Sequence, residues 1–62
     1  MSEEELKAQI KKLNARATQL KMDLHDLSEE LPINWERIPE VAAKTFEAYQ
    51  ALAEARANLK GI

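Results

Sequence analysis

Residues 31–38 read Leu-Pro-Ile-Asn-Trp-Glu-Arg-Ile, and this stretch separates two long segments that favour helix. Pro32 cannot continue an α-helix, and it also pushes Leu31 out of the helical region of backbone space. Pro39 follows the stretch and suits the first turn of a new helix, where a missing N–H costs nothing. We therefore predict two helices, over residues 3–30 and about 39–60.

The ends of both helices carry capping signals. Ser2 with Glu5 three residues later forms a capping box, in which the serine side chain accepts a hydrogen bond from a free backbone N–H. Asn34 is a suitable N-cap for a short turn over residues 35–37. Gly61 is placed for a left-handed residue that ends the second helix. These signals support the predicted boundaries.

The first segment carries one narrow apolar stripe. Its apolar residues recur at alternating steps of four and three, and on a helix they fall within an arc of roughly 100°. A stripe of this kind is typical of the seam of a helical bundle. The stripe consists of Leu6, Ile10, Leu13, Ala17, Leu20, Leu24, Leu27 and Leu31.

The second segment carries two apolar stripes side by side. Together they span an arc of roughly 200° on the helix, which is too wide for one neighbouring helix to cover. The first stripe is Val41, Thr45, Ala48, Leu52, Ala55 and Leu59. The second stripe is Ala42, Phe46, Tyr49 and Ala53.

These patterns predict an all-α fold built from one domain, residues 1–62. The short connection makes the two helices antiparallel neighbours, which is a helical hairpin. A chain of 62 residues buries too small a share of its surface to be comfortably stable alone. We therefore predict a homodimer that forms a four-helix bundle. Its expected core and dimer residues are Leu6, Ile10, Leu13, Ala17, Leu20, Leu24, Leu27, Leu31, Val41, Phe46, Leu52 and Leu59.

The composition argues against several functional classes. The chain has no cysteine, which excludes disulfides and thiolate metal sites within it. Its formal net charge of −2 gives no reason to expect nucleic acid or an anionic membrane as the main partner. The apolar residues are dispersed, so we expect no membrane-spanning segment. No nucleophile–base pair or phosphate-binding loop is recognisable, and we expect neither an enzyme nor a bound cofactor.

His25 is the only histidine, and Glu29 lies one helical turn after it. A histidine and a carboxylate at this spacing can reach the same metal ion. They supply half of a site, which a dimer axis could double. The favoured interpretation is an ordinary surface histidine, and a weak metal carrier remains an alternative.

Basic side chains lie along one side of the first helix, and we call them the basic flank. They are Lys7, Lys11, Lys21 and His25. Such a row could contact phosphates, as in an RNA-binding bundle. It could also match the acidic part of an antiparallel neighbour and set the register between helices. We favour the second interpretation, because no aromatic residue lies among these residues.

A cluster of large side chains lies at the loop and the first half of the second helix. The favoured expectation is that these side chains form the core at the end of the bundle. Exposed members could instead anchor a protein partner, a role in which tryptophan and tyrosine are common. The candidate partner-binding residues are Ile33, Trp35, Arg37 and Tyr49.

The chain resembles the Rop-like small proteins of nitrogen-fixation gene clusters, a family of uncharacterised function. The resemblance implies helical hairpins that pair into four-helix bundles, and a role in the nitrogenase system. It is carried by Lys-Lys-Leu-Asn at 11–14, Lys-Met-Asp-Leu-His-Asp-Leu at 21–27, Glu-Leu-Pro at 30–32, Trp-Glu at 35–36 and Val-Ala-Ala-Lys-Thr-Phe at 41–46.

This resemblance leads to a functional hypothesis. We expect a non-catalytic, cytoplasmic accessory protein that binds itself and also binds nitrogenase, its molybdenum–iron component or an assembly intermediate. The alternatives are an RNA-binding bundle and the weak metal carrier described above.

Overall fold

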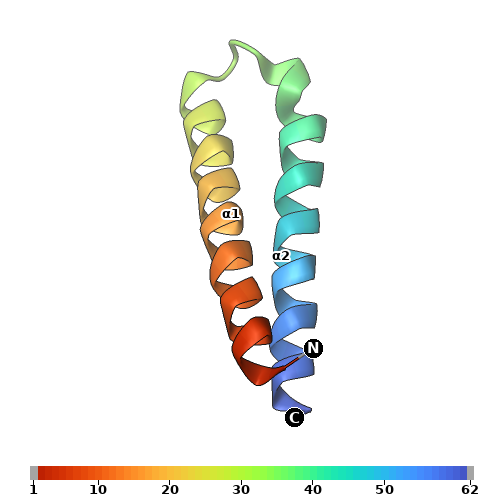
Figure 1. The fold of residues 1–62 in the computed structure, drawn as a ribbon. Helices are drawn as coiled ribbons and strands as arrows, with labels where there is room; N and C mark the ends of the chain where they lie inside the picture. The colour runs from red at the N-terminus through yellow and green to blue at the C-terminus, as the bar shows by residue number, and fades with distance from the viewer. Residues whose placement is uncertain (1, 62) are drawn as a thin grey trace.

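The computed structural model describes residues 2–61, and it shows an antiparallel helical hairpin (Figure 1). Helix α1 spans Glu3–Glu30, a single 3₁₀ turn η1 spans Trp35–Arg37, and helix α2 spans Ile38–Lys60. The two long helices lie side by side, and both chain ends lie at the end opposite the loop (Figure 1). The predicted all-α hairpin is confirmed, and α2 begins one residue before the predicted boundary.

Helix α1 begins and ends as the sequence predicts. The backbone N–H of Glu5 donates to the side-chain oxygen of Ser2 at 3.2 Å, and the first turn is acidic, which favours a helix N-terminus. Leu31 has φ −54° and ψ 141°, an extended conformation that Pro32 imposes on the residue before it. The peptide bond between Leu31 and Pro32 is cis.

Replacing Ser2 by alanine is expected to lower the free energy of unfolding by about 1 kcal/mol, since one N–H of the first turn loses its acceptor. Thermal unfolding followed by circular dichroism measures this change. The matched control is Ser28→Ala, because Ser28 is also exposed and donates only to the backbone oxygen of His25. Equal losses of unfolding free energy in both variants would show that the capping hydrogen bond of Ser2 does not stabilise the helix more than an ordinary exposed serine does.

The two other end signals are only partly confirmed. Asn34 occupies the N-cap position of the predicted turn η1, but its side chain makes no capping hydrogen bond. It has φ 61°, a left-handed conformation that asparagine tolerates, and its amide donates to a carboxylate oxygen of Glu30 at 3.5 Å. Gly61 has φ −74° and is not left-handed. Its N–H lies 3.2 Å from the carbonyl oxygens of both Ala57 and Asn58, so helical geometry simply continues through it.

The core is a single seam between the two helices. Its centre lies halfway along the hairpin, where Ala17, Ala48 and Leu52 are almost fully buried. Small alanines allow the helices to approach closely, and the larger residues Ile10, Leu13 and Leu20 pack around them. The buried residues are Leu6, Ala17, Leu27, Val41, Ala48, Leu52 and Ala55.

Thr45 is the polar member of the seam, and it links the two helices. Its hydroxyl lies 2.8 Å from the carbonyl oxygen of Val41 in its own helix and 3.3 Å from that of Leu20 in α1. A partly buried hydroxyl with acceptors on both helices favours one register of α1 against α2.

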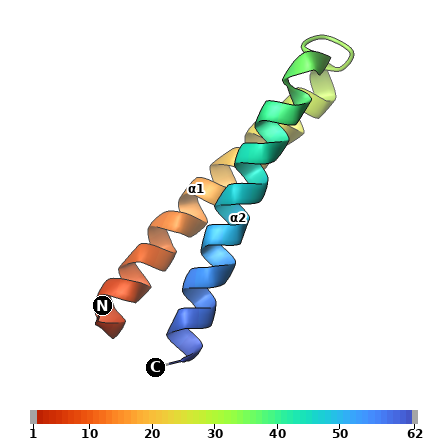
Figure 2. The ribbon, with the colours of Figure 1, turned by 90° about the vertical axis from the view of Figure 1, so that its right-hand side faces the viewer.

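The hairpin is a thin rod with extents of 45 × 15 × 13 Å. It consists of one layer of two helices, which cross at a slight angle in the view of Figure 2. A rod this thin has two long side faces that no other element of residues 2–61 covers. None of the helices described has the length and apolar character needed to cross a membrane.

Candidate protein-interaction surfaces

The loop end presents two large apolar side chains to solvent. Ile33 is 67% exposed and Trp35 is 62% exposed. The backbone beneath them is held by hydrogen bonds, in which the N–H of Ile33 donates to Glu30 and the N–H of Trp35 donates to Pro32. The side chains therefore stand on an ordered turn, which lowers the entropy cost of using them as anchors.

The structure separates the four candidate partner-binding residues. Ile33, Trp35 and Arg37 lie together at the loop end, in or beside η1. Tyr49 lies beside Ala48, halfway along α2, because a helix advances about 1.5 Å per residue and carries it well away from Trp35. The loop end and the face around Tyr49 are thus two distinct surfaces.

The second apolar stripe of α2 is not covered by α1. Phe46 is 68% exposed and Tyr49 is 40% exposed, while Ala42 is only half-buried and Ala53 is exposed. With Ile38, which shares this side of α2, these residues form what we call the aromatic face. An exposed phenylalanine on a long apolar face is typical of a surface that binds another helix.

Among the predicted core and dimer residues, most of those on α1 and α2 lie in or beside the seam. Ile10, Leu13, Leu20, Leu24 and Leu59 are half-buried in the single hairpin. Leu31 is 40% exposed, since it belongs to the loop and not to the helix. Phe46 belongs to the aromatic face, and α1 does not cover it.

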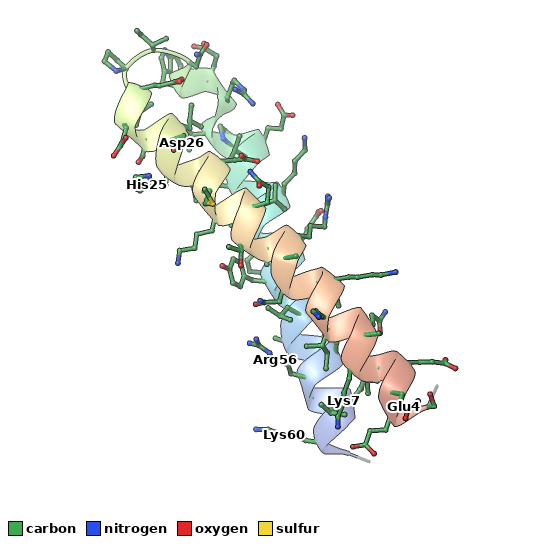
Figure 3. The ribbon with its side chains drawn as sticks, turned by 60° about the vertical axis from the view of Figure 1, so that its left-hand side comes forward. Glu4, Lys7, His25, Asp26, Arg56 and Lys60 are labelled. Carbon is green, nitrogen blue, oxygen red and sulfur yellow. The ribbon has the colours of Figure 1, made fainter. Side chains whose placement is uncertain are left out.

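The basic surface of the hairpin extends beyond the basic flank of α1 to residues of α2. Figure 3 shows His25 of α1 projecting to the same side as Arg56 and Lys60 of α2. Arg56 is seven residues after Tyr49, so it also continues the line of the aromatic face. The four-residue spacing of Arg56 and Lys60 places both side chains on one side of α2. This spacing was the sequence signal for the wider basic surface, and considering α1 alone missed it.

Charge pairing within the described residues is local. Lys7 pairs with Glu3 at 3.4 Å and Lys44 pairs with Glu40 at 3.1 Å, both one turn apart on the same helix. Within residues 2–61 no ion pair joins α1 to α2. If the basic flank pairs with acidic side chains of a neighbouring helix, that helix belongs to another chain.

The pair of Glu40 and Lys44 lowers the pKa of the Glu40 carboxyl below its usual value, chiefly through the hydrogen bond and then through the charge of Lys44. We expect Lys44→Met to raise this pKa towards the usual range, which NMR titration of the side chain measures. A lowered pKa means that the pair favours folding at neutral pH and loses this effect as the pH falls through that pKa. An unchanged pKa in Lys44→Met would contradict the assignment.

His25 lies on the surface between two carboxylates. Its Nε2 is 3.5 Å from Glu29 and its Nδ1 is 3.7 Å from Asp26, and all three side chains are largely exposed. In the described part of the chain, no three histidine or carboxylate side chains come together as metal ligands. The predicted spacing of His25 and Glu29 is present, and it amounts to half of a site.

We expect His25→Ala to shift the melting temperature by no more than about 1–2 °C, the change that a fraction of a kcal/mol produces in a chain of this size. Added Zn²⁺ should stabilise the wild type only slightly. Differential scanning calorimetry with and without the metal checks both statements. A large stabilisation by Zn²⁺ that His25→Ala abolishes would favour the metal carrier.

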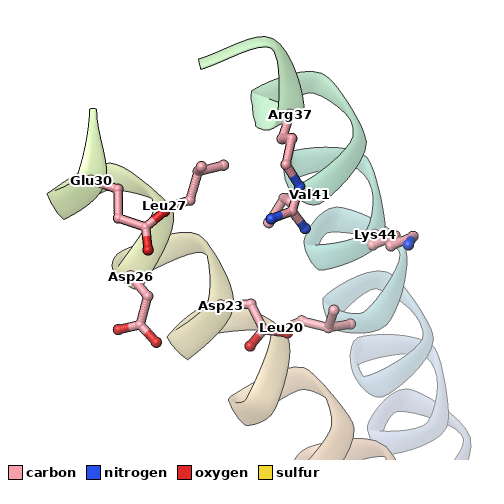
Figure 4. Close-up of a pocket in the computed structure, with 8 residues that line it drawn as sticks. All are labelled: Leu20, Asp23, Asp26, Leu27, Glu30, Arg37, Val41 and Lys44. Carbon is pink, nitrogen blue, oxygen red and sulfur yellow. The ribbon is translucent and has the colours of Figure 1, made fainter. Parts of the chain in front are cut away.

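A hollow of about 240 Å³ lies between the helices near the loop, on an apolar floor that includes Leu27 and Val41 (Figure 4). Asp23, Asp26 and Glu30 line its α1 side, and Arg37 and Lys44 line its α2 side. Charges of both signs surround it, and it is open to solvent. It adds polar groups next to the loop end.

Comparison with known proteins identifies related chains. The sequence profile described as Rop-like matches residues 2–62. A UPF0437 protein of Azorhizobium caulinodans is 54% identical over 57 residues, which cover 92% of this chain and 83% of that protein. A UPF0437 protein of Frankia alni, described as lying in the nifX-nifW intergenic region, is 52% identical over 44 residues, covering 71% of this chain and 54% of that one.

A solved structure shows the same architecture. An NMR structure of a structural-genomics target protein superposes with a TM-score of 0.85 at 64% sequence identity, covering 94% of this chain and 82% of that chain. The descriptions of these relatives name no enzymatic activity. One of them is located among nitrogen-fixation genes.

Proposed function

Because the chain belongs to the Rop-like family, we propose that it is a non-catalytic accessory protein of nitrogen fixation. In this proposal it acts in the cytoplasm and binds nitrogenase, either the molybdenum–iron component or an assembly intermediate of that component. The location of the Frankia relative in the nifX-nifW intergenic region supports the link with nitrogen fixation.

The exposed loop end is the observation that carries a binding function. Ile33 and Trp35 place large apolar surface in water on an ordered turn, and the charged residues Glu36 and Arg37 follow Trp35 in η1. Protein–protein contacts are typically centred on such an apolar anchor within a polar rim. We assign the docking of the nitrogenase component to Ile33, Trp35 and Arg37.

The aromatic face supports a second part of the proposal, which is homodimerisation. Phe46 and Tyr49 belong to an apolar arc that one neighbouring helix cannot cover. A second hairpin would complete a four-helix bundle and bury both residues. Tyr49, which the sequence placed among partner-binding residues, then serves the contact between the two copies.

The test of the proposed function is co-purification. Affinity-tagged protein is recovered from nitrogen-fixing cells and from ammonium-grown cells, and the recovered proteins are identified by mass spectrometry. We expect nitrogenase or its assembly proteins with the tagged chain from nitrogen-fixing cells, and not with the tag alone. If none of them is recovered after mild cross-linking, the proposed function is wrong.

RNA binding is a second candidate, and one structural observation favours it. The steps of seven residues from Tyr49 to Arg56 and of four residues from Arg56 to Lys60 place these three side chains on one side of α2. Figure 3 shows Arg56 and Lys60 projecting to the same side as His25 of the basic flank, so basic groups and an aromatic group lie on one side of the rod. The net charge of −2 opposes this candidate. An RNA affinity that falls steeply with added salt would support it, and the lack of binding at low salt would exclude it.

A further inference from the structure

The hollow near the loop opens on the side of the hairpin away from the aromatic face. Arg37 and Lys44 line its α2 side, and they lie four residues before and three residues after the buried Val41. On a helix these steps turn both side chains to the same side of Val41, whereas the eight-residue step to Tyr49 turns that side chain to the other side. A molecule that covers the aromatic face therefore leaves the hollow accessible.

The α1 side of the hollow carries negative charge that the chain does not neutralise. Asp23 accepts a hydrogen bond from the uncharged side-chain amide of Gln19 at 3.1 Å, and Glu30 accepts one from that of Asn34 at 3.5 Å. Both carboxylates are exposed, and neither forms an ion pair with another of residues 2–61. They can therefore bind a cation without giving up a charged partner.

The α2 side of the hollow does not supply that cation. Lys44 donates to Glu40 at 3.1 Å, so its charge is matched within α2. Arg37 extends from α2 into the space between the helices (Figure 4), but in the described part of the chain it forms no ion pair with a carboxylate of α1. The charge of Arg37 also repels a second cation from the α2 side. A positive group that enters the hollow is thus directed to α1 and comes from another molecule.

The floor and the size of the hollow suit one long side chain. Leu27 and Val41 form an apolar floor, and the volume of about 240 Å³ is smaller than the roughly 300–1,000 Å³ of typical small-molecule sites. An arginine can lay its aliphatic stem along such a floor and keep its charged end at the rim. Asp23, Asp26 and Glu30 follow one another along α1, and a planar guanidinium with five donors can bond two carboxylates at once. The compact ammonium of a lysine matches this row less well.

The loop half of the rod as a whole attracts a positive surface. Residues 18–48, which run from the middle of α1 through the loop to the middle of α2, contain seven acidic and three basic side chains, excluding His25. The net negative field of this half increases the rate at which a partner with a basic surface is encountered. Charge complementarity therefore favours a cationic group of a protein partner in the hollow.

We propose that the hollow receives an arginine side chain of the protein that docks on the loop end. Resting on the proposed function, this assignment extends the docking surface from Trp35 through Arg37 to the carboxylates of α1. Arg37 is the link, because it belongs both to the docking residues and to the lining of the hollow. Trp35 supplies apolar contact area, while Asp23 and Glu30 select partners that present an arginine at the matching place.

Binding of a small arginine compound to the purified protein tests the preference of the hollow. We expect N-acetylargininamide to shift the backbone NMR signals of Asp23, Leu27 and Glu30 in a saturable way, and to shift them more than N-acetyllysinamide does at the same concentration. Each compound carries one positive charge, so the ionic strength is equal. The shifts should disappear in the double variant Asp23→Asn with Glu30→Gln, which keeps the size of both side chains and removes their charge.

The same double variant tests the use of the hollow in docking. We expect its affinity for the purified molybdenum–iron component to be about tenfold lower than that of the wild type, because two charged hydrogen-bond acceptors are lost. The matched control is Glu47→Gln with Glu54→Gln, which removes the same charge from two exposed residues of α2, also seven residues apart, that do not line the hollow. This control should change the affinity by no more than about twofold, since salt screens such distant charges. Circular dichroism should show wild-type helical content in both double variants.

The outcomes separate this inference from the proposed function. Absent shifts, equal shifts with the arginine and lysine compounds, or shifts that persist in Asp23→Asn with Glu30→Gln would overturn the assignment of arginine to the hollow. An equal change of affinity in both double variants, or no change in either, would mean that docking does not use the hollow. If the wild type bound no nitrogenase component while the arginine shifts were present, the proposed function would be wrong and the preference of the hollow for arginine would stand.

Discussion

Replacing Leu52 by alanine is expected to lower the free energy of unfolding by about 2–5 kcal/mol. Leu52 is 2% exposed and lies at the centre of the seam with Ala17 and Ala48. Those neighbours are too small to fill the space that the leucine leaves. Because a chain of this length has a total stability of roughly 3–9 kcal/mol, the loss is a large fraction of the total, and the variant should unfold at a much lower urea concentration. Urea titration followed by circular dichroism measures the loss.

The control for this prediction is Leu31→Ala, which removes the same atoms from a residue that is 40% exposed at the loop. We expect that change to cost less than about 1 kcal/mol. If both variants lost the same stability, the seam around Leu52 would not be the core of the protein. If the chain is a dimer, the midpoint of unfolding should also rise with protein concentration.

Replacing Trp35 by alanine is expected to reduce co-purification of the nitrogenase component at least tenfold, a change of about 1.4 kcal/mol or more in binding free energy. Trp35 is 62% exposed, so its removal leaves no cavity in the seam. Helical content and sedimentation should therefore remain those of the wild type. Unfolding of the variant would instead place Trp35 in the core.

Two controls separate the loop end from other surfaces. Met22→Ala removes another exposed apolar side chain, 54% exposed on α1, and should leave co-purification unchanged. Reversing Lys11 and Lys21 to glutamate should have a smaller effect that depends on salt, because these residues would tune the encounter and not anchor the contact. If the reversal abolished binding and Trp35→Ala kept it, the docking surface would be the basic flank.

The helices could be predicted from the sequence because their signals are local and strong. The regular apolar steps of the first segment, the cap at Ser2 and the two prolines each act within a few residues. These local effects determine where α1 ends and roughly where α2 begins. The hairpin follows from the short connection between them.

The details of the loop and the C-terminus depended on weaker preferences. Asparagine favours both a capping position and a left-handed conformation, and at Asn34 the left-handed conformation occurs. A glycine permits a left-handed residue without requiring one, and Gly61 remains helical. Sequence preference alone could not choose between such alternatives.

The candidate surfaces could not be predicted from the sequence, because they depend on how the two helices pack against each other. The sequence grouped Tyr49 with the loop residues because they are close along the chain and chemically alike. In the structure, Tyr49 lies at mid-rod, and its seven-residue spacing from Arg56 places both residues on one side of α2. The packing of α1 against α2 determines which rows of side chains lie on the same side of the hairpin. The sequence pattern of one helix alone does not reveal this.

Direct titration of the purified molybdenum–iron component of nitrogenase with the purified protein tests the central claim most directly. We expect saturable binding to the wild type at moderate salt, and at least tenfold weaker binding to Trp35→Ala. The Met22→Ala variant should bind like the wild type. Saturable binding that is equal for wild type and Trp35→Ala, or no binding to this component and to its assembly intermediates, would contradict the claim.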